Sequence, residues 1–201
     1  FTGFFGRCQT ALMSFCLMGL VFMIYSNSLR GPFIFDDMKN IEYNAHIRLN
    51  QLTFDGLKKA GFESHSPDRP VSNISFALNH YFHGKSTFGY HLVNVLLHAF
   101  NAILLFLVLR CLRVPGAWLA AALFALHPVL VESVAWITER KNVLSGFFYL
   151  SSALAYFRFA NVTGDLADTS LSSDIDPLTS TKGGRSWGLY AFSLFLFVCA
   201  L

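Results

Sequence analysis

Charged residues are scarce in this 201-residue chain. Only 13% of its residues are Asp, Glu, Lys or Arg, whereas 54% are hydrophobic. This is more apolar material than one soluble core of that size needs, so the balance predicts a membrane protein. The formal charge is only +3, and the sequence has no run of five or more Lys and Arg, which argues against nucleic acid as a partner.

Cysteine is also rare, and its spacing excludes the usual cysteine sites. The four Cys lie in or beside apolar stretches, without CxxC spacing or a His cluster nearby. We interpret them as small hydrophobic residues and not as disulfides or zinc ligands. P-loop, GxGxxG, HExxH and GxSxG motifs are absent as well, which excludes the common classes of soluble enzyme.

Long apolar stretches are what the sequence has instead. Five of them approach the roughly 20 residues that a helix needs to cross a bilayer, at residues 8–28, 88–109, 115–131, 143–160 and 187–201. They predict an all-α, polytopic helical membrane protein. The last stretch ends in mid-run, so we expect the N-terminal part of one larger membrane domain. The first stretch is also compatible with a signal peptide, but its length favours a retained anchor.

Short loops set the predicted orientation. The connector with Arg110 and Arg113 has two cations and no acid, which places it in the cytoplasm by the positive-inside rule. The N-terminus and the loop 161–186 are then cytoplasmic, and the loop 29–87 is periplasmic or lumenal. The inner loop is rich in Ser, Thr, Asp and Gly, and we expect it to be flexible.

The outer loop contains two helical patterns. Residues 53–62 predict a short helix that Gly56 and Gly61 weaken. Residues 70–83 predict a stronger one, because Pro70 suits a first helical turn and apolar residues recur at i, i+3, i+7 and i+10. We expect this helix to lie on the membrane surface, with its apolar face in lipid or against neighbouring spans.

Polar residues recur inside the second span. His91, Asn94, His98 and Asn101 fall within a sector of roughly 80° on a helix, so they form one stripe. Such groups are costly against lipid, and the stripe is therefore expected to face other helices or a water-filled cavity. Hydrogen-bonded helix packing and a functional site are equally compatible with it.

Three further places carry charged residues at the predicted outer surface. Asp36 and Asp37 follow an apolar segment where the first span ends, and such carboxylates suit a general base; a solvated acidic turn is the alternative.

Pro128 is expected to kink the third span and to bring His127, Glu132 and Arg140 to the same level; interfacial charged residues are the alternative. Arg69 offers a planar fork for phosphate oxygens, although exposed loop arginines are mostly solvated.

The order and spacing of these motifs resemble a known family. The motifs are Phe35-Asp36-Asp37 with Asn40 and Ile41, Arg69-Pro70, Tyr90 to Asn94 with His98, and Ala125 to Pro128 through Glu132, Trp136 and Arg140. They resemble the GT-C membrane glycosyltransferases, and more closely the N-terminal part of the transmembrane and tetratricopeptide-repeat O-mannosyltransferase-like proteins of eukaryotes and bacteria. The helical repeats of that family are absent from these residues.

The resemblance implies a GT-C-like fold and a sugar-transferring enzyme. The donor would be a polyprenyl-phosphate sugar, with mannose as the candidate sugar, and the acceptor a hydroxyl group, on a protein among other candidates. Asp36 would be the general base, and Asp37 would orient the acceptor or a metal; whether a divalent metal takes part is left open. Donor phosphate and sugar contacts would come from Arg69, His91, Asn94, His98, His127, Glu132 and Arg140.

Two other functions fit the same residues. In a transporter or channel half, the polar stripe of the second span would line a permeation path. In a non-catalytic membrane scaffold, the outer loop would be a docking surface. The membrane is either a bacterial inner membrane or that of the endoplasmic reticulum.

Overall fold

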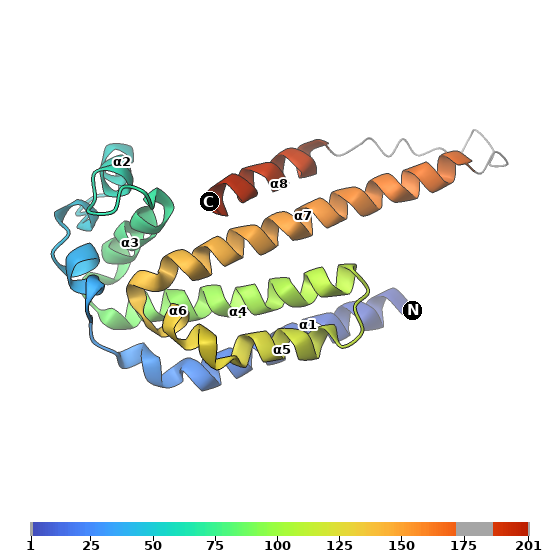
Figure 1. The fold of residues 1–201 in the computed structure, drawn as a ribbon, viewed down its shortest axis with the longest axis horizontal. Coiled ribbons are helices and arrows are strands. Elements are labelled where there is room, and N and C mark those ends of the chain that lie inside the picture. Colours follow the sequence, from blue (N-terminus) through green and yellow to red (C-terminus); the bar gives the residue numbers. More distant parts are fainter. Residues whose placement is uncertain (1, 172–186, 201) are drawn as a thin grey trace.

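The computed structural model describes residues 2–171 and 187–200, and within them all regular structure is helical. The long helices run side by side along the molecule (Figure 1): α1 (Thr2–Tyr25), α4 (Thr87–Cys111), α5 (Ala117–Leu126), α7 (Arg140–Leu171) and α8 (Trp187–Ala200). Residues 31–86, which we call the cap, lie at one end and contain η2 (Met38–Glu42), η3 (Ala45–Ile47), α2 (Phe54–Phe62) and α3 (Pro70–His83). Short helices join the long ones: η1 (Ser26–Arg30), η4 (Pro128–Leu130), α6 (Val131–Ala135) and η5 (Ile137–Glu139).

The described residues contain three or four candidate membrane spans, which confirms the prediction of a polytopic helical protein. Three helical stretches are long and apolar enough, at 6–30, 87–111 and 137–160. The bent pair 117–126 and 128–135 makes a fourth if it is counted as one span. The fifth expected span stays a prediction: α8 is apolar and has 14 residues in the part described, which is about 21 Å of the roughly 30 Å that a bilayer core measures.

The third span is broken where the sequence predicted a kink. Helix α5 ends at Leu126, and the following pair of short helices departs from it by 50°. His127 is extended, and its Nδ1 accepts a hydrogen bond of 3.2 Å from the Val129 amide. Pro128 cannot donate a backbone hydrogen bond, which is why the helix does not continue.

Helix α7 is longer than the sequence predicted. A loop was expected from residue 161, but the helix continues to Leu171. The stretch 161–171 has one glycine and no proline, so no residue in it forces the helix to stop once it has been nucleated. The expected flexibility of the remaining inner loop, residues 172–186, lies outside the described residues.

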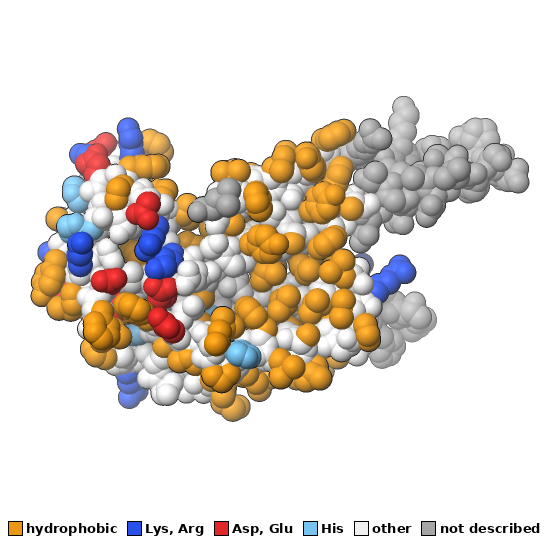
Figure 2. Space-filling model, in the orientation of Figure 1, with side chains coloured by type: hydrophobic (Ala, Val, Ile, Leu, Met, Phe, Trp, Pro, Cys, Tyr) orange, Lys and Arg blue, Asp and Glu red, His pale blue; other side chains and the backbone are white. Residues whose placement is uncertain are grey.

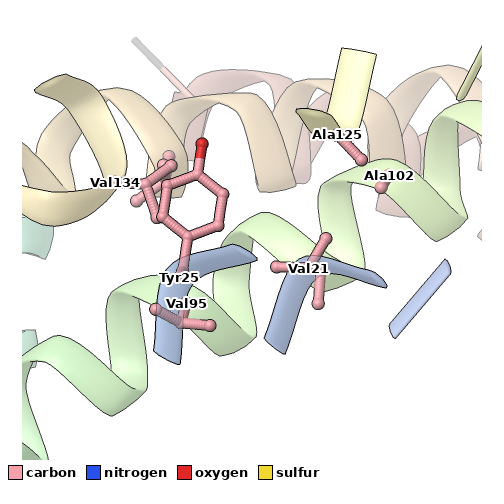
Figure 3. Close-up of a cluster of buried hydrophobic side chains, with 8 residues drawn as sticks. Val21, Tyr25, Val95, Ala102, Ala125 and Val134 are labelled. Carbon is pink, nitrogen blue, oxygen red and sulfur yellow. The ribbon is translucent and has the colours of Figure 1, made fainter. Parts of the chain in front are cut away.

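The bundle core is made from small and β-branched side chains. Val21 and Tyr25 of α1 meet Val95 of α4, Ala125 of α5 and Val134 of α6 (Figure 3). Small residues let helices approach closely, and close packing holds helices together in lipid, where the hydrophobic effect does not. Because α1 contributes fully buried side chains, its packing fits a retained anchor.

The cap has a core of its own that continues into the bundle. Ile41, Ile47 and Phe76 of the cap cluster with Tyr90 of α4 and Ile137 of η5. Charged side chains gather at the cap end, whereas hydrophobic ones cover the helices beside it (Figure 2). The cap is therefore a polar, folded end piece on an apolar bundle.

Both predicted cap helices are present, but α3 turns its polar side inward. It begins at Pro70 as expected and ends before Gly84, whose φ of +58° suits glycine. Ser72 and Asn79 on its polar side are only 7% and 4% exposed, whereas Val71 and Tyr81 are 36% and 42% exposed. Val71 and Tyr81 are thus left partly exposed, whereas Ser72 and Asn79 face the protein.

The contact between α4 and α7 gives a first prediction. A Cβ atom on Gly146 would lie 3.2 Å from Asn101 Nδ2, so Gly146→Leu should force the helices apart and destabilise the protein by about 1–3 kcal/mol. Gly19 on α1 has no heavy atom within 4 Å of such a Cβ, and Gly19→Leu is the matched control. Thermal unfolding of the full-length protein in detergent should separate the two variants; equal midpoints would contradict this packing.

Candidate functional site

The polar stripe of α4 joins helices together. His91, Asn94, His98 and Asn101 are all at most 4% exposed. Each bonds to a backbone carbonyl of another segment: His91 Nε2 to Gly31 at 3.1 Å, Asn94 Nδ2 to Trp136 at 3.2 Å, His98 Nε2 to Ala125 at 3.0 Å and Asn101 Nδ2 to Val143 at 2.8 Å. Three of these segments, around Gly31, Ala125 and Trp136, lie at helix ends, where carbonyls lack intrahelical partners. The packing interpretation is thus supported over a permeation path.

Among the described residues, Arg140 is the largest fully buried side chain, with an exposed fraction of 0%. Its Nε donates to Asn94 Oδ1 at 2.8 Å, and its Nη2 donates to Asn79 Oδ1 at 2.8 Å and to the Tyr90 carbonyl at 2.9 Å. Its Nη1 donates to the Ser75 carbonyl at 3.3 Å. One side chain of α7 therefore binds both α3 and α4, and it is closed to a ligand in this structure.

The charge of Arg140 is balanced without a carboxylate in the described part of the chain. All the acceptors are neutral oxygens, and the guanidinium also lies 4.5 Å from the ring centre of Phe76. A buried cation is tolerated only when its donors are satisfied, and here an aromatic face adds to the oxygens. This explains why the polar side of α3 faces inward.

The two adjacent aspartates have different environments. Asp37 is 1% exposed; its Oδ1 accepts from the Thr138 amide at 2.8 Å and from the Thr138 hydroxyl, and its Oδ2 accepts from the Ile34 amide at 3.1 Å. Asp36 is exposed. Asp37 thus fastens this segment to η5, directly before α7, and Asp36 is left with a carboxylate open to a ligand.

The residue before Asp36 has an unusual backbone, which sequence reasoning missed. Phe35 has φ of +46°, in the left-handed region that non-glycine residues avoid. Its ring is 81% exposed and lies edge-on to Trp136, 6.0 Å between centroids. Such a conformation costs about 1–3 kcal/mol and persists only where neighbouring contacts impose it. The contacts of Asp37 on the other side of Asp36 supply that constraint.

Arg69 lies on a pocket of about 310 Å³ between the start of α3, the start of α7 and the end of α8. Its Nε is 3.3 Å from Asp68, and the pair is largely exposed. Lys141 lines the same pocket, although the sequence pattern had indicated its neighbour Arg140 as the site residue. Helical geometry predicts this difference, because adjacent side chains on a helix point about 100° apart. Only one of Arg140 and Lys141 can therefore enter the core.

The remaining candidates are exposed and separate. His127 caps the break in the third span, and Glu132 lies in the following helix; both are solvent-accessible. Among the described residues, no hydrogen bond or ion pair joins either of them to Asp36, Arg69 or Arg140.

Metal binding finds no support in the part of the chain that the structure describes. No three His, Cys, Asp or Glu side chains come together there. Both oxygens of Asp37 already accept hydrogen bonds from the protein, so a metal on Asp37 would have to displace them. The residues present therefore do not fit a metal at this aspartate.

His80 on α3 is the histidine outside the spans with a shifted pKa. Burial lowers its pKa, and the positive charges of Arg48 and Lys85 lower it further. Both effects favour the neutral form of this side chain.

Comparison with known proteins identifies the relatives of this chain. It is 36% identical over 153 residues to protein O-mannosyl-transferase tmtc2 of Xenopus laevis, and 37% identical over 148 residues to Tmtc1 of Drosophila melanogaster. The human TMTC2 protein is 36% identical over 157 residues. The chain is a homologue of the TMTC protein O-mannosyl-transferases.

The homology covers most of this chain and a small part of each TMTC relative. The three alignments include 69–73% of this chain and 17–18% of the relatives. The chain thus spans less than a fifth of the length of these three relatives. No family model and no solved structure matches the chain.

The different environments of the two aspartates give a second prediction. Asp37→Ala removes the acceptor for the buried Thr138 amide and for the partly buried Ile34 amide and should destabilise the full-length protein by about 2–4 kcal/mol. Asp36→Ala, at an exposed neighbouring position, should change stability by less than about 0.5 kcal/mol. Denaturant or thermal unfolding in detergent checks this, and equal losses in the two variants would refute the structural role of Asp37.

Proposed function

We propose that this chain is part of the catalytic membrane domain of a GT-C type glycosyltransferase. It transfers a sugar, mannose by analogy with the names of its relatives, from a polyprenyl-phosphate donor to a hydroxyl group of a protein acceptor. The observation that carries the proposal is Asp36: an exposed carboxylate between a strained residue and a buried anchor. Such a fixed, accessible acid is what a general base requires.

An exposed Asp36 carboxylate would act in the sugar transfer as follows. The acceptor oxygen attacks the anomeric carbon, the bond between that carbon and the phosphate oxygen breaks, and Asp36 takes the acceptor proton. A carboxylate close by also favours the positive charge that develops on the sugar. Asp37 acts as a positioning residue, because its bonds to Thr138 hold the segment that carries Asp36.

The leaving phosphate needs cationic groups. Arg69 is the accessible candidate from the sequence, whereas Arg140 and His91 are buried and hydrogen-bonded to protein. We assign Arg140, His91, Asn94 and His98 to holding the frame of the site. His127 and Glu132 are exposed and stay candidates for sugar contacts.

The cap is proposed to lie on the periplasmic or lumenal side. The opposite end of the bundle has the short connector with Arg110 and Arg113, and the positive-inside rule favours the cytoplasm for it. The acceptor would then reach Asp36 from outside the cytoplasm, in a bacterial inner membrane or in the endoplasmic reticulum. In the whole protein, tetratricopeptide repeats of the kind found in the resembled family would contact the protein acceptor.

Activity of the full-length protein tests the base. Asp36→Asn should lower transfer of labelled mannose from polyprenyl-phosphate mannose to an acceptor protein by about 10²-fold or more, since it removes the proton acceptor. Asp36→Glu should retain part of the activity. Asp55→Asn changes an exposed acid of α2 that pairs with Lys59 and should have no effect.

Membrane insertion and thermal stability of Asp36→Asn should equal those of the unmodified protein. Full transfer activity in Asp36→Asn would remove Asp36 as the base. A non-catalytic scaffold would show no transfer in any of these proteins, including the unmodified one.

A further inference from the structure

Unusual backbone conformations stand on both sides of Asp36. Before it, Phe35 has a φ of +46°, in the left-handed region. Shortly after it, residues 38–42 form the π-helix η2. Strained residues and π-helical turns are both uncommon, and both are concentrated at functional sites. The Phe35 conformation does not serve to bury the side chain, because the ring is 81% exposed.

The aromatic neighbour of Phe35 has a hydrogen-bond donor without an acceptor. The rings of Phe35 and Trp136 meet edge-on, with 6.0 Å between their centroids. Trp136 Nε1 is buried, yet it has no hydrogen-bond partner within the described residues. A buried indole N–H usually finds an acceptor, and leaving it unpaired is costly. This unpaired donor is independent of the strain at Phe35, and it points to an acceptor that comes from a ligand.

The aromatic pair and the acidic pair are joined at two places. One is the ring contact between Phe35 and Trp136. The other is the hydrogen bond of 2.8 Å from the amide of Thr138, two residues after Trp136, to Asp37. Because adjacent Cα atoms lie about 3.8 Å apart, a ligand that packs on the Phe35 ring is within reach of the Asp36 carboxylate.

A sugar ring is the ligand that matches both features. A pyranose has an apolar face of C–H groups, which packs on an aromatic ring, and hydroxyl groups at its edge, which accept from an N–H. A hydrocarbon chain would cover the Phe35 ring but would leave Trp136 Nε1 unpaired. An anion would accept from the N–H but would leave the Phe35 ring uncovered.

We propose that Phe35 and Trp136 bind the sugar ring of the donor beside Asp36. This assignment rests on the proposed function, which supplies a sugar on polyprenyl phosphate. The Phe35 ring packs on the C–H face of the sugar, and Trp136 Nε1 donates to a sugar hydroxyl. Since Nε1 is closed to solvent in this structure, the hydroxyl reaches it when the contact between the two rings opens. The Phe35 ring is not packed in the core and can turn.

Donor binding to the purified full-length protein in detergent tests this contact without requiring turnover. The probes are polyprenyl-phosphate mannose and polyprenyl phosphate, and the ratio of their dissociation constants, measured by native mass spectrometry, gives the preference for the sugar. The unmodified protein should bind the mannosylated lipid more tightly. Phe35→Asn should reduce the preference by about fivefold, since it removes the ring. Phe35→Tyr should retain it.

Further comparisons separate the ring, the donor and the backbone. Asn adopts the left-handed conformation more readily than most residues, so Phe35→Asn should keep the thermal unfolding midpoint of the unmodified protein. Trp136→Phe keeps an aromatic ring but removes the N–H, and it should reduce the preference by about threefold. Phe54→Asn removes an 86% exposed ring at the start of α2; it is the matched control and should leave the preference unchanged.

The outcomes separate the sugar contact from the proposed function. Equal affinity of the unmodified protein for the two lipids, or an unchanged preference in both Phe35→Asn and Trp136→Phe, overturns the contact. If Phe35→Asn raises the KM of the acceptor protein and not that of the donor, the assignment to the donor sugar is wrong. A preference that depends on Phe35 in a protein without transfer activity would support the contact and refute the proposed function.

Discussion

A cation buried without a carboxylate is the constraint on which the rest of this structure depends. Taking the Arg140 guanidinium out of water costs several kcal/mol, and hydrogen bonds to Asn94, Asn79, Tyr90 and Ser75 offset that cost. These acceptors come from α3 and α4, whereas the arginine comes from α7. The cap is therefore not a loose loop on the bundle; it supplies half of the shell around a buried charge.

The residues next to Arg140 connect this buried charge with the parts of the protein that we assign to chemistry. Two residues before Arg140, Thr138 binds Asp37 and thereby fixes the segment with Phe35 and Asp36. One residue after it, Lys141 turns to the pocket at the start of α3. Once Arg140 is seated in the core, the directions of its neighbours follow from helical geometry. Within residues 138–141, Thr138, Arg140 and Lys141 therefore lie in three different environments: beside Asp37, in the core and at the pocket.

Local patterns in the sequence predicted the features that depend on local physics. Pro70 begins a helix, Pro128 breaks a span, and the four polar residues of α4 share one buried side, all as the spacing indicated. The face of α3 was harder to predict, since amphipathic reasoning assumes that polar residues seek water. In α3 they instead bind the buried side chain of Arg140, which lies about 60 residues away in the sequence.

The different roles of Asp36 and Asp37 could not be predicted from the sequence either. Asp36 and Asp37 are the same residue type in the same turn, and they differ only because one meets Thr138, 101 positions along the chain. The pocket of Lys141 needs α3, α7 and α8 together, which no single pattern encodes. The family, in contrast, could be predicted from the sequence, because the motifs that resemble it are local. The homology to the TMTC proteins agrees with that resemblance.

Hydrogen exchange in α3 of the full-length protein tests most directly whether Arg140 holds the cap. Arg140→Lys keeps the charge but offers three donors on a flexible stem instead of the planar fork. Our account predicts faster exchange of the amides of residues 70–83 in Arg140→Lys, with the amides of α5 unchanged. Unchanged protection of α3 would contradict it, because the cap would then be held by its apolar contacts alone.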